Sequence, residues 1–510
     1  MTISEKLSKY AADFTIDSVS PEAVAEASRH FADTIACMTA GASSDTVAKI
    51  ESYAVNNNGG HPESTILGFG GAHCKAAFAA MVNAASAHCR DFDDMSVSLN
   101  GHASAVLVPV ALAMGERHHI SGRGVIEAYI LGVEIDALLG KMLINSPYHK
   151  AWNTSCTIGI AGATATACKL MGASQEDYTN AFGLAVSSVG CVKENYGTSA
   201  KDISVGITAF MAIFCSEMAN CGIVSNSKIF EGNNGVYAAT GVLGTQGDID
   251  RIIREHKSDF LMPGMILKPY PTCRGNHTVL DCFTRLVNGN RITPDMIQKV
   301  ICKVQQTVLD TDKYPYPTTR EQAKFSIRYC IGKILYAKKL LIEDFVGDKP
   351  LDAQAVDFMD RVEVLLDCGF DDARFGAEVE IMTTGAQSYS MRCCAASGDP
   401  MCPMSSVEIE NKWKDCILSK YPLEQADRIL AALRDIPSVQ DICCLLYTSG
   451  IDAEGQPFYG PEEDKALFDT LRNDVDKSKV EIVEVDQHIN DPAFAKAAAQ
   501  KLVDLMSAVG

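Results

Sequence analysis

Several features that would assign this chain to a familiar class are missing from its sequence. The chain has 19 cysteines but no C-x-x-C spacing, and adjacent pairs such as Cys393–Cys394 and Cys443–Cys444 suit neither an ordinary disulfide nor a zinc site. Residues 1–10 lack the apolar segment of a secretory signal peptide. We therefore expect reduced, mostly buried thiols and a cytoplasmic protein.

The sequence also lacks a basic stripe and a long apolar run. With 45 Lys and Arg against 64 Asp and Glu, the net charge is -19, which disfavours nucleic acid as a partner because phosphate contacts require clustered cations. The longest apolar candidate, 155–171, is interrupted by threonine, glycine and Lys169, so we expect no membrane span. Because an acidic surface repels anions at long range, an anionic substrate would need Lys, Arg and His side chains inside a pocket.

What the sequence does contain is enough apolar residues for a large core. Hydrophobic residues make up 47% of the 510 positions, and a chain of this length is expected to form two or three domains. Residues 1–265 have the apolar spacing of successive helices, 266–404 mix strands with helices, and helices return at 405–445, where we expect the chain to pack back on the first part. Residues 446–510 are expected to form an additional α/β tail.

Individual elements follow from periodicity and from residues that begin or end helices. The Ser20–Pro21 pair, for example, supplies a helix cap and a proline at the first helical position. Helices are expected at 21–41, 76–88, 105–117, 124–139, 157–170, 175–189, 204–220, 320–335, 406–418 and 424–433, and strands at 64–68, 299–308, 362–366, 377–382 and 389–394. In the tail we expect helices at 462–473 and 492–506 and a strand at 480–485.

The densest polar cluster of the first half runs from His88 to Asp94 and is followed by His102. Three interpretations compete. The acids could be solvated charges at a helix end, or they could bind magnesium as in isoprenoid synthases, although that chemistry needs a second acidic helix and none is evident. The third interpretation is an acid/base site in which Asp91 and His102 flank a substrate, since histidine moves protons near neutral pH.

Two basic clusters lie further along the chain. Lys201 precedes a helix expected to begin near Ser204, and a lysine beside a helix N-terminus favours anions, although it could equally be a surface residue. Lys268, Arg274 and His277 lie within a segment containing two prolines at the expected domain boundary. That segment could line an interdomain cleft or could simply be a linker.

Together these clusters resemble the MmgE/PrpD family in order and spacing. The resemblance runs over residues 1 to about 440 and does not depend on any single motif. Its main segments are Thr65-Ile-Leu-Gly-Phe-Gly70, Ala80-Met-Val-Asn-Ala-Ala-Ser-Ala-His88, Asp91-Phe-Asp-Asp94, Gly101-His102, Lys201, Lys268-Pro-Tyr-Pro271 with His277, Ala323-Lys-Phe-Ser326 and Gly398-Asp-Pro400.

The resemblance implies a mostly α fold, in which a large all-helical domain is built from both ends of the chain and a smaller α+β lid domain is inserted between them. It also implies a homodimer formed through the large domain, with no metal and no cofactor. Known activities of such proteins are 2-methylcitrate dehydration, cis-aconitate decarboxylation and iminodisuccinate epimerisation, all on small polycarboxylates. By the resemblance, the catalytic residues are Asp91, His102, Lys201 and Lys268, and the substrate-binding candidates are Asp94, Asn153, Arg274 and His277.

The sequence departs from the decarboxylase-like pattern at Met95, Ala103, Asn153 and Leu309. We therefore expect a lyase of the 2-methylcitrate dehydratase type. The alternatives are an epimerase or isomerase that moves the proton alpha to a carboxylate, a cis-aconitate decarboxylase-like lyase, and a non-catalytic carboxylate-binding relative. Separately, residues 483–494 of the tail resemble the C-terminal end of Tm-1-like ATP-binding proteins.

Overall fold

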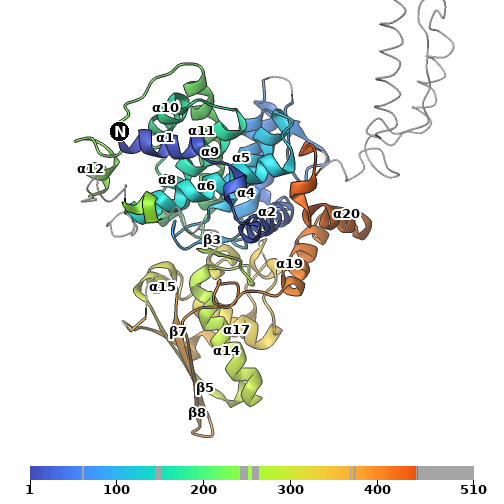
Figure 1. The fold of residues 1–510 in the computed structure, drawn as a ribbon. Helices are drawn as coiled ribbons and strands as arrows, with labels where there is room; N and C mark the ends of the chain where they lie inside the picture. The colour runs from blue at the N-terminus through green and yellow to red at the C-terminus, as the bar shows by residue number, and fades with distance from the viewer. Residues whose placement is uncertain are drawn as a thin grey trace, which may run out of the picture. The chain divides into compact units, whose positions relative to one another are not determined.

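The computed structural model describes residues 1–445 apart from 60–61, 144–150, 242–250, 256–263, 348, 368, 371–374 and 444. The chain divides into two compact units, Met1–Ser449 and Gly450–Gly510. The elements expected within 446–510 lie outside the described residues. Within the first unit, helices dominate and a small sheet occupies the α+β region, as expected (Figure 1).

The helical part of the first unit is built from both ends of the described chain. Its core joins side chains from the first 267 residues to side chains of the returning helices, among them Ile409 and Leu430. Small residues permit close contacts: a Cβ at Gly41 would lie 1.8 Å from the carbonyl oxygen of Ser86. The helices are α1 Ile3–Asp13, α2 Pro21–Gly41, α3 Asp45–Asn56, α4 Ala76–His88, α5 Ser104–Arg117, α6 Gly122–Leu143, α8 Thr154–Thr157, α9 Gly159–Leu170, α10 Gln175–Ala185, α11 Ser199–Asn220, α12 Val236–Thr240, α19 Ser406–Leu418 and α20 Leu423–Leu433.

The α+β region has a four-stranded sheet in the order β6-β5-β7-β8. Strand β5 pairs in parallel with β6 and antiparallel with β7, and β7 pairs antiparallel with β8. Alternate residues of β7 are buried, because α14 packs against β7 and β8. The elements are α14 His277–Asn290, β5 Ile297–Val304, α15 Gln306–Thr311, α16 Arg320–Ala323, α17 Ile327–Ala337, α18 Ala353–Phe358, β6 Val362–Leu366, β7 Ala377–Thr383 and β8 Ser388–Cys393.

Two short strands that pair with each other join the α+β region to the helices near the acidic run. Strand β3 (Met95–Ser96) pairs antiparallel with β4 (Met265–Ile266). Met95 and Ile266 are buried in the core of the α+β region and not in the helical core. The segment that follows Asp94 is therefore anchored in both parts of the molecule.

Several expected boundaries were wrong. Helix α11 begins at Ser199, not near Ser204, so Lys201 lies in its first turn. The expected strand 299–308 ends at Val304 and is followed by α15. The expected helix 320–335 is divided into α16 and α17, because the Ser326 side chain caps a new helix by accepting a hydrogen bond from the backbone of Tyr329.

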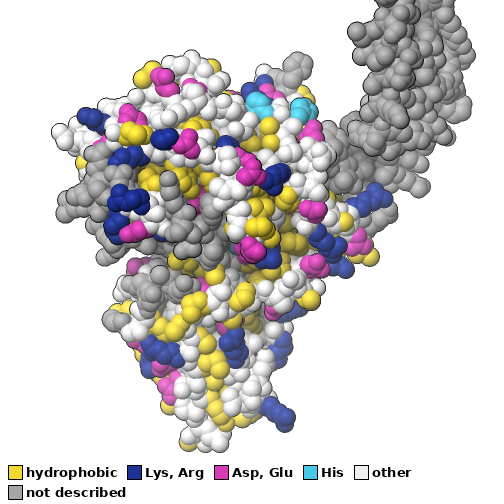
Figure 2. All heavy atoms as spheres, in the orientation of Figure 1, with side chains coloured by type: hydrophobic (Ala, Val, Ile, Leu, Met, Phe, Trp, Pro, Cys, Tyr) yellow, Lys and Arg dark blue, Asp and Glu magenta, His cyan; other side chains and the backbone are white. Residues whose placement is uncertain are grey.

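The expectation that no segment reaches membrane-spanning length was also wrong in one respect. Helix α11 has 22 residues and a mean hydropathy of 1.4 over its best window. It packs against α4, α9 and α10 within the helical core, which accounts for its apolar character. On the described surface shown in Figure 2, basic and acidic side chains are interspersed and form no basic stripe.

Candidate functional site

Asp91 lies at the end of α4, where the chain reverses direction. Its backbone has φ 51°, in the left-handed region that aspartate tolerates better than most residues, and its N–H donates to the His88 carbonyl at 3.0 Å. The side chain is only 2% exposed. This turn places the Asp91 carboxylate in contact with Lys268.

Three side-chain nitrogens gather around one oxygen of Asp91. Lys268 Nζ donates to Asp91 Oδ1 at 2.8 Å and to the Asp91 carbonyl at 2.9 Å. Lys201 Nζ lies 3.5 Å from the same Oδ1, and His102 Nε2 lies 3.9 Å from it. Asp91 Oδ2 is buried and has no hydrogen-bond partner among the described residues. Three of the predicted catalytic residues therefore converge on the carboxylate of the fourth, Asp91, whose other oxygen is buried without a partner among the described residues.

The charges of this cluster support one another. Burial alone would raise the pKa of Asp91, but Lys201 and Lys268 hold it well below its usual value. Burial alone would lower the pKa of Lys201, but Asp91 and nearby acids raise it. Lys201 Nζ also lies 5.7 Å from the ring centroids of Tyr196 and Phe325. The cluster therefore holds an ionised carboxylate and a charged lysine.

His102 is positioned by its backbone as well as by its ring. Its N–H donates to Ser155 Oγ at 2.9 Å, and a Cβ at the preceding Gly101 would lie 2.7 Å from Thr154 Oγ1. Asn153, a substrate-binding candidate, is buried and caps α8, since its Oδ1 accepts from the Ser155 N–H at 3.2 Å. Asn153 thus helps to hold the helix start that anchors His102.

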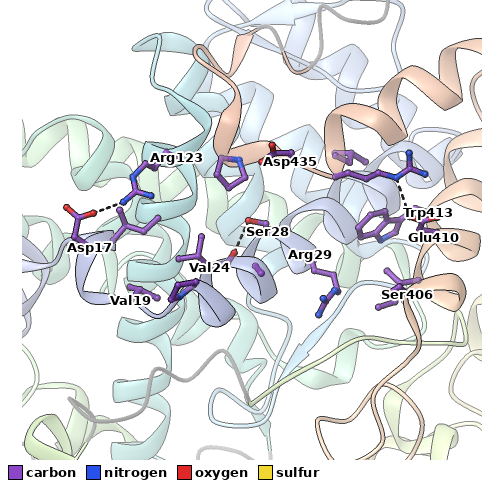
Figure 3. A pocket seen from close by; sticks show the side chains of 17 residues that line it. Asp17, Val19, Val24, Ser28, Arg29, Arg123, Ser406, Glu410, Trp413 and Asp435 are labelled. Atoms are coloured by element: carbon purple, nitrogen blue, oxygen red, sulfur yellow. Dashed lines mark hydrogen bonds and ion pairs between the residues drawn. The ribbon is translucent and has the colours of Figure 1, made fainter.

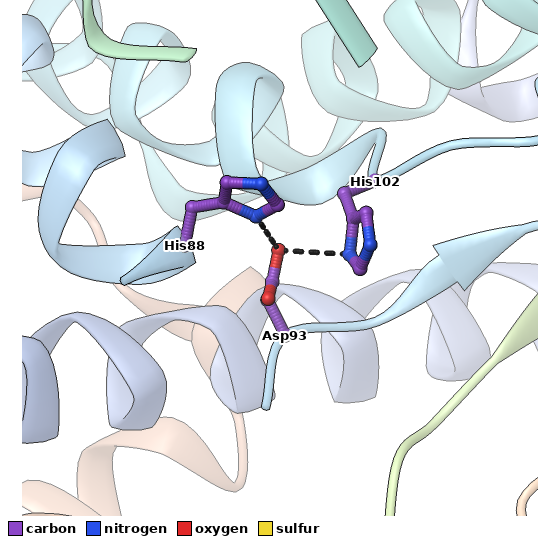
Figure 4. Close-up of side chains that lie close together, drawn as sticks. All are labelled: His88, Asp93 and His102. Atoms are coloured by element: carbon purple, nitrogen blue, oxygen red, sulfur yellow. Dashed lines mark hydrogen bonds and ion pairs between the residues drawn. The ribbon is translucent and has the colours of Figure 1, made fainter. Parts of the chain in front are cut away.

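A second carboxylate, Asp93, lies between two histidines (Figure 4). His88 Nδ1 is 2.8 Å from Asp93 Oδ2, and His102 Nδ1 is 3.0 Å from the same oxygen, although not in line for a well-aligned hydrogen bond. The two rings meet edge to face, with centroids 4.7 Å apart. Neither His88 nor Asp93 was among the predicted site residues.

Asp94, a predicted substrate-binding residue, does not join the cluster around Asp91. Its Oδ2 lies 2.7 Å from His30 Nδ1 and accepts from Ser104 Oγ at 2.6 Å, and its side chain is fully buried. Ser104 in turn contacts the Tyr129 hydroxyl at 2.7 Å. The geometry assigns Asp94 to the helical core, where it secures the loop after the acidic run.

Arg274 and His277 come from the start of the α+β region, near the cluster around Asp91. His277 Nε2 is 3.2 Å from the Thr272 carbonyl, and its Nδ1 is 3.3 Å from Arg274 Nη1. Donating at Nε2 while accepting at Nδ1 suits a neutral ring, and burial together with Arg274 and Lys268 lowers the pKa of His277 well below its usual value. Arg274 Nη1 also donates to the Ser397 carbonyl at 3.1 Å, but its Nε and Nη2 have no partner among the described residues.

Lys324 is a structural support that sequence reasoning did not single out. Its side chain is 2% exposed, and its Nζ donates to the Cys89 carbonyl at 2.7 Å, next to the turn at Asp91. Its own carbonyl accepts from the Cys273 N–H at 3.0 Å. Lys324 therefore links the turn at Asp91 to the segment that carries Lys268. The only sequence signal was its place in the Ala323–Ser326 segment of the family resemblance.

These contacts argue against two of the three interpretations of the acidic run, the solvated helix end and the magnesium site. The solvated helix end is wrong, because Asp91, Asp93 and Asp94 are each at most 2% exposed. The acids also do not face one another as magnesium ligands would, since Asp91 faces lysines, Asp93 faces histidines and Asp94 faces His30. By ligand type alone, two described groups could hold a metal: His88 with Asp93 and His102, and His119 with Asp441 and Cys443.

Two of the described cavities show where small molecules could approach. One of about 450 Å³ is lined by Lys193, Lys313 and Tyr196, and the Tyr196 ring lies beneath Lys201. A cavity of about 720 Å³ on the helical domain (Figure 3) contains none of the predicted site residues. Arginines line it, but Arg123 and Arg434 are paired with Asp17 and Glu410. None of the predicted site residues lines the smaller cavity either, but that cavity reaches Tyr196, whose ring lies 5.7 Å from Lys201 Nζ.

Comparison with known proteins matches two separate stretches of the chain to the two domains of one family. Residues 5–243 match the MmgE/PrpD N-terminal domain and 270–436 match the MmgE/PrpD C-terminal domain. A cis-aconitate decarboxylase-like protein of Aspergillus oryzae is 21% identical over 393 residues, which are 72% of this chain and 81% of the relative.

The tail matches a different family. Residues 427–506 match the C-terminal domain of an uncharacterised protein family, UPF0261. A UPF0261 protein of Clostridium tetani is 60% identical over 58 residues, which are 11% of this chain. The chain spans only 14% of the length of that relative. We expected the tail to resemble the C-terminal end of Tm-1-like ATP-binding proteins; the comparison confirms a second family in the tail and identifies it as UPF0261.

Proposed function

The chain belongs to the MmgE/PrpD family, and on that premise we propose that it is a lyase that eliminates water from a small di- or tricarboxylate. The observation that carries the proposal is the cluster around Asp91: two buried lysines and a histidine face one carboxylate whose second oxygen is open. An acidic protein that concentrates buried cations at one point has built a local site for anions.

The two lysines suit the charge that develops during such a reaction. Removing a proton alpha to a carboxylate places negative charge on that carboxylate as an enolate-like species. A fixed ammonium group stabilises that charge more strongly in a buried site than in water. Lys201 lies 3.5 Å from Asp91 Oδ1, farther than Lys268 at 2.8 Å, so we assign the main contact with the substrate carboxylate to Lys201.

His102 is better suited than Asp91 to take the proton. A carboxylate whose pKa lies well below its usual value is a weak base. His102 Nε2 faces the same space from 3.9 Å. In our proposal His102 Nε2 removes the alpha proton, the carbon–carbon double bond forms as the carbon–oxygen bond breaks, and the imidazolium returns the proton to the departing hydroxide. Water leaves and His102 is neutral again, while Asp91 Oδ2 accepts a hydrogen bond from the substrate.

Direct assays test the proposal. The purified chain is incubated with 2-methylcitrate, citrate and cis-aconitate, and the unsaturated product is followed by ultraviolet absorbance and by NMR. Formation of an alkene with release of water supports the hydro-lyase. Solvent deuterium that enters a substrate without net product would instead indicate an isomerase, and binding without turnover or exchange would indicate a non-catalytic relative.

A decarboxylase is the second candidate, and the Aspergillus oryzae relative favours it by name. Release of labelled carbon dioxide from carboxyl-labelled cis-aconitate, without hydration or dehydration, would replace the first proposal with this one. We further propose a cytoplasmic, metal-free and cofactor-free homodimer that binds neither nucleic acid nor membranes. Activity that EDTA abolishes and magnesium restores, or a stable monomer in light scattering, would overturn those parts.

A further inference from the structure

We propose that Asp93, held by His88, is a positioning residue that keeps the proton of neutral His102 on Nδ1 and leaves Nε2 free to act on the substrate. This inference rests on the proposed function for the role of His102, but its first observation is purely geometric. Both imidazole Nδ1 atoms face one carboxylate oxygen, at 2.8 Å from His88 and 3.0 Å from His102.

The direction of the His102 ring gives the second step. With Nδ1 toward Asp93, the opposite nitrogen, Nε2, faces Asp91 Oδ1 at 3.9 Å. A carboxylate can only accept, so Nδ1 must carry the proton to bond with Asp93, and Nε2 of the neutral ring is then a lone-pair acceptor. The imperfect alignment of the Nδ1 contact is common in catalytic hydrogen bonds before the substrate is bound.

His88 donates a hydrogen bond to Asp93 without neutralising the negative charge of that carboxylate. Its side chain is 1% exposed, and burial together with Lys201 lowers the pKa of His88 to about 4. His88 is therefore neutral at physiological pH and donates a hydrogen bond while leaving the negative charge on Asp93. That charge remains available to stabilise the His102 imidazolium that forms when Nε2 takes a proton.

The same run of sequence provides a matched comparison. Asp94 is as fully buried as Asp93 but faces His30 and Ser104. Substituting asparagine at either position removes one buried carboxylate from the same loop. Only the change at Asp93 should alter His102, because Asp94 does not contact it.

The tautomer of His102 is measured in full-length protein labelled with 15N-histidine, by two-bond proton–nitrogen correlation, with the signal assigned from its loss in His102→Gln. We expect the proton on Nδ1 in the wild type and in Asp94→Asn, and its transfer to Nε2 in Asp93→Asn. In the wild type, a proton on Nε2, or an Nδ1 that carries none because a metal occupies it, overturns the inference. Since this measurement needs no substrate and the wild type alone can contradict it, it remains decisive if Asp93→Asn does not fold or no substrate is found.

Turnover supplies the second measurement once the screen identifies a substrate. Asp93→Asn should lower kcat at least about 100-fold, because the wrong nitrogen then carries the proton, with KM changed less than about threefold. A purely structural role would instead lower the thermal stability and the folded fraction without a separate loss of kcat per folded enzyme. Unchanged kcat together with a retained Nδ1 proton in Asp93→Asn would overturn the role.

Discussion

Two buried lysine–aspartate pairs hold the acidic loop: Lys412 with Asp33, which we call the complete pair, and Lys268 with Asp91, which we call the open pair. Lys412 Nζ donates to Asp33 Oδ2 at 2.8 Å, and Trp413 Nε1 donates to Asp33 Oδ1 at 3.1 Å. Both oxygens of that carboxylate are therefore bonded. In the pair formed by Lys268 and Asp91, the lysine bonds one oxygen, while the other has no partner among the described residues.

We interpret this difference as separating a structural pair from the pair that belongs to the proposed site. The Asp33 pair also fixes the acidic loop, because Lys412 Nζ donates to the Phe92 carbonyl at 2.9 Å. A buried polar atom left without a partner costs free energy, so the open oxygen of Asp91 is a cost that a bound molecule would relieve. A third side chain lies near each pair and fits this distinction. Trp413 is hydrogen-bonded to Asp33, whereas His102 Nε2 lies 3.9 Å from Asp91 Oδ1.

The largest effect is expected from replacing His102, the histidine beside the open pair of Lys268 and Asp91. His102→Gln should lower kcat by about 10² to 10⁴, the usual contribution of a general acid or base, with little change in the free energy of unfolding. Steady-state kinetics and urea denaturation measure the two quantities. The control is His119→Asn at an exposed histidine with φ 52°, a conformation that asparagine accepts. Turnover within about twofold of the wild type would exclude His102 from proton transfer.

Breaking the complete pair should change stability instead. Lys412→Met leaves the Asp33 charge buried and uncompensated, so the free energy of unfolding should fall by about 3 to 5 kcal/mol. Urea denaturation measures it, and Lys414→Met, at an exposed position of the same helix, should stay within about 0.5 kcal/mol. A loss below about 1 kcal/mol for Lys412→Met would show that the two pairs do not differ as described.

The lysine of the open pair should matter for activity more than for folding. Lys268→Ala should lower kcat/KM about 100-fold, or roughly 3 kcal/mol, because one cation near the developing charge is lost. Its effect on unfolding should be smaller than that of Lys412→Met, since Lys201 still faces Asp91. Lys299→Ala, at a half-exposed lysine of β5, serves as the control. If Lys268→Ala loses more stability than activity, the open pair is structural.

The smallest effect concerns the buried histidine–carboxylate pair of His30 and Asp94. Burial alone would lower the pKa of His30, but Asp94 and Glu26 raise it to about 9. The charged form is therefore favoured by folding, and its stabilisation is full below the unfolded pKa of about 6.5 and declines as pH rises through about 9. Between pH 7 and 9 the wild type should lose on the order of 2 kcal/mol of unfolding free energy that His30→Asn does not lose. Unfolding free energies are measured by urea denaturation at both pH values, and an equal change between pH 7 and 9 in the wild type and in His30→Asn would contradict this.

Sequence alone predicted the fold class and the convergence of several site residues. Asp91, His102, Lys201 and Lys268 belong to motifs far apart in sequence, and the structure brings them around one oxygen. Their catalytic roles remain predictions. Helices α4 and α19 have the expected bounds, α4 because it is an almost continuous apolar run and α19 because its apolar residues recur at helical spacing.

Neighbouring acids of the same type could not be told apart by sequence. Asp93 and Asp94 are adjacent, yet one faces His102 and the other faces His30. That choice depends on the left-handed turn at Asp91 and on partners contributed by distant helices, which periodicity does not reveal. The strand expected at 299–308 failed for a related reason: Val308 is buried, as alternation requires, but it is buried on a helix that follows the strand.

The bond from Lys412 to the Phe92 carbonyl has a consequence for how the enzyme is made. A ribosome that has synthesised Lys268 has supplied every side chain of the cluster around Asp91. The loop that carries Asp91 still waits for its anchor, which is translated roughly 140 residues later, or about 7 to 30 seconds at ordinary elongation rates. During that interval the nascent chain has the chemical groups of the proposed site without the tether that holds them in place, so we expect the site to be complete only after α19 is translated.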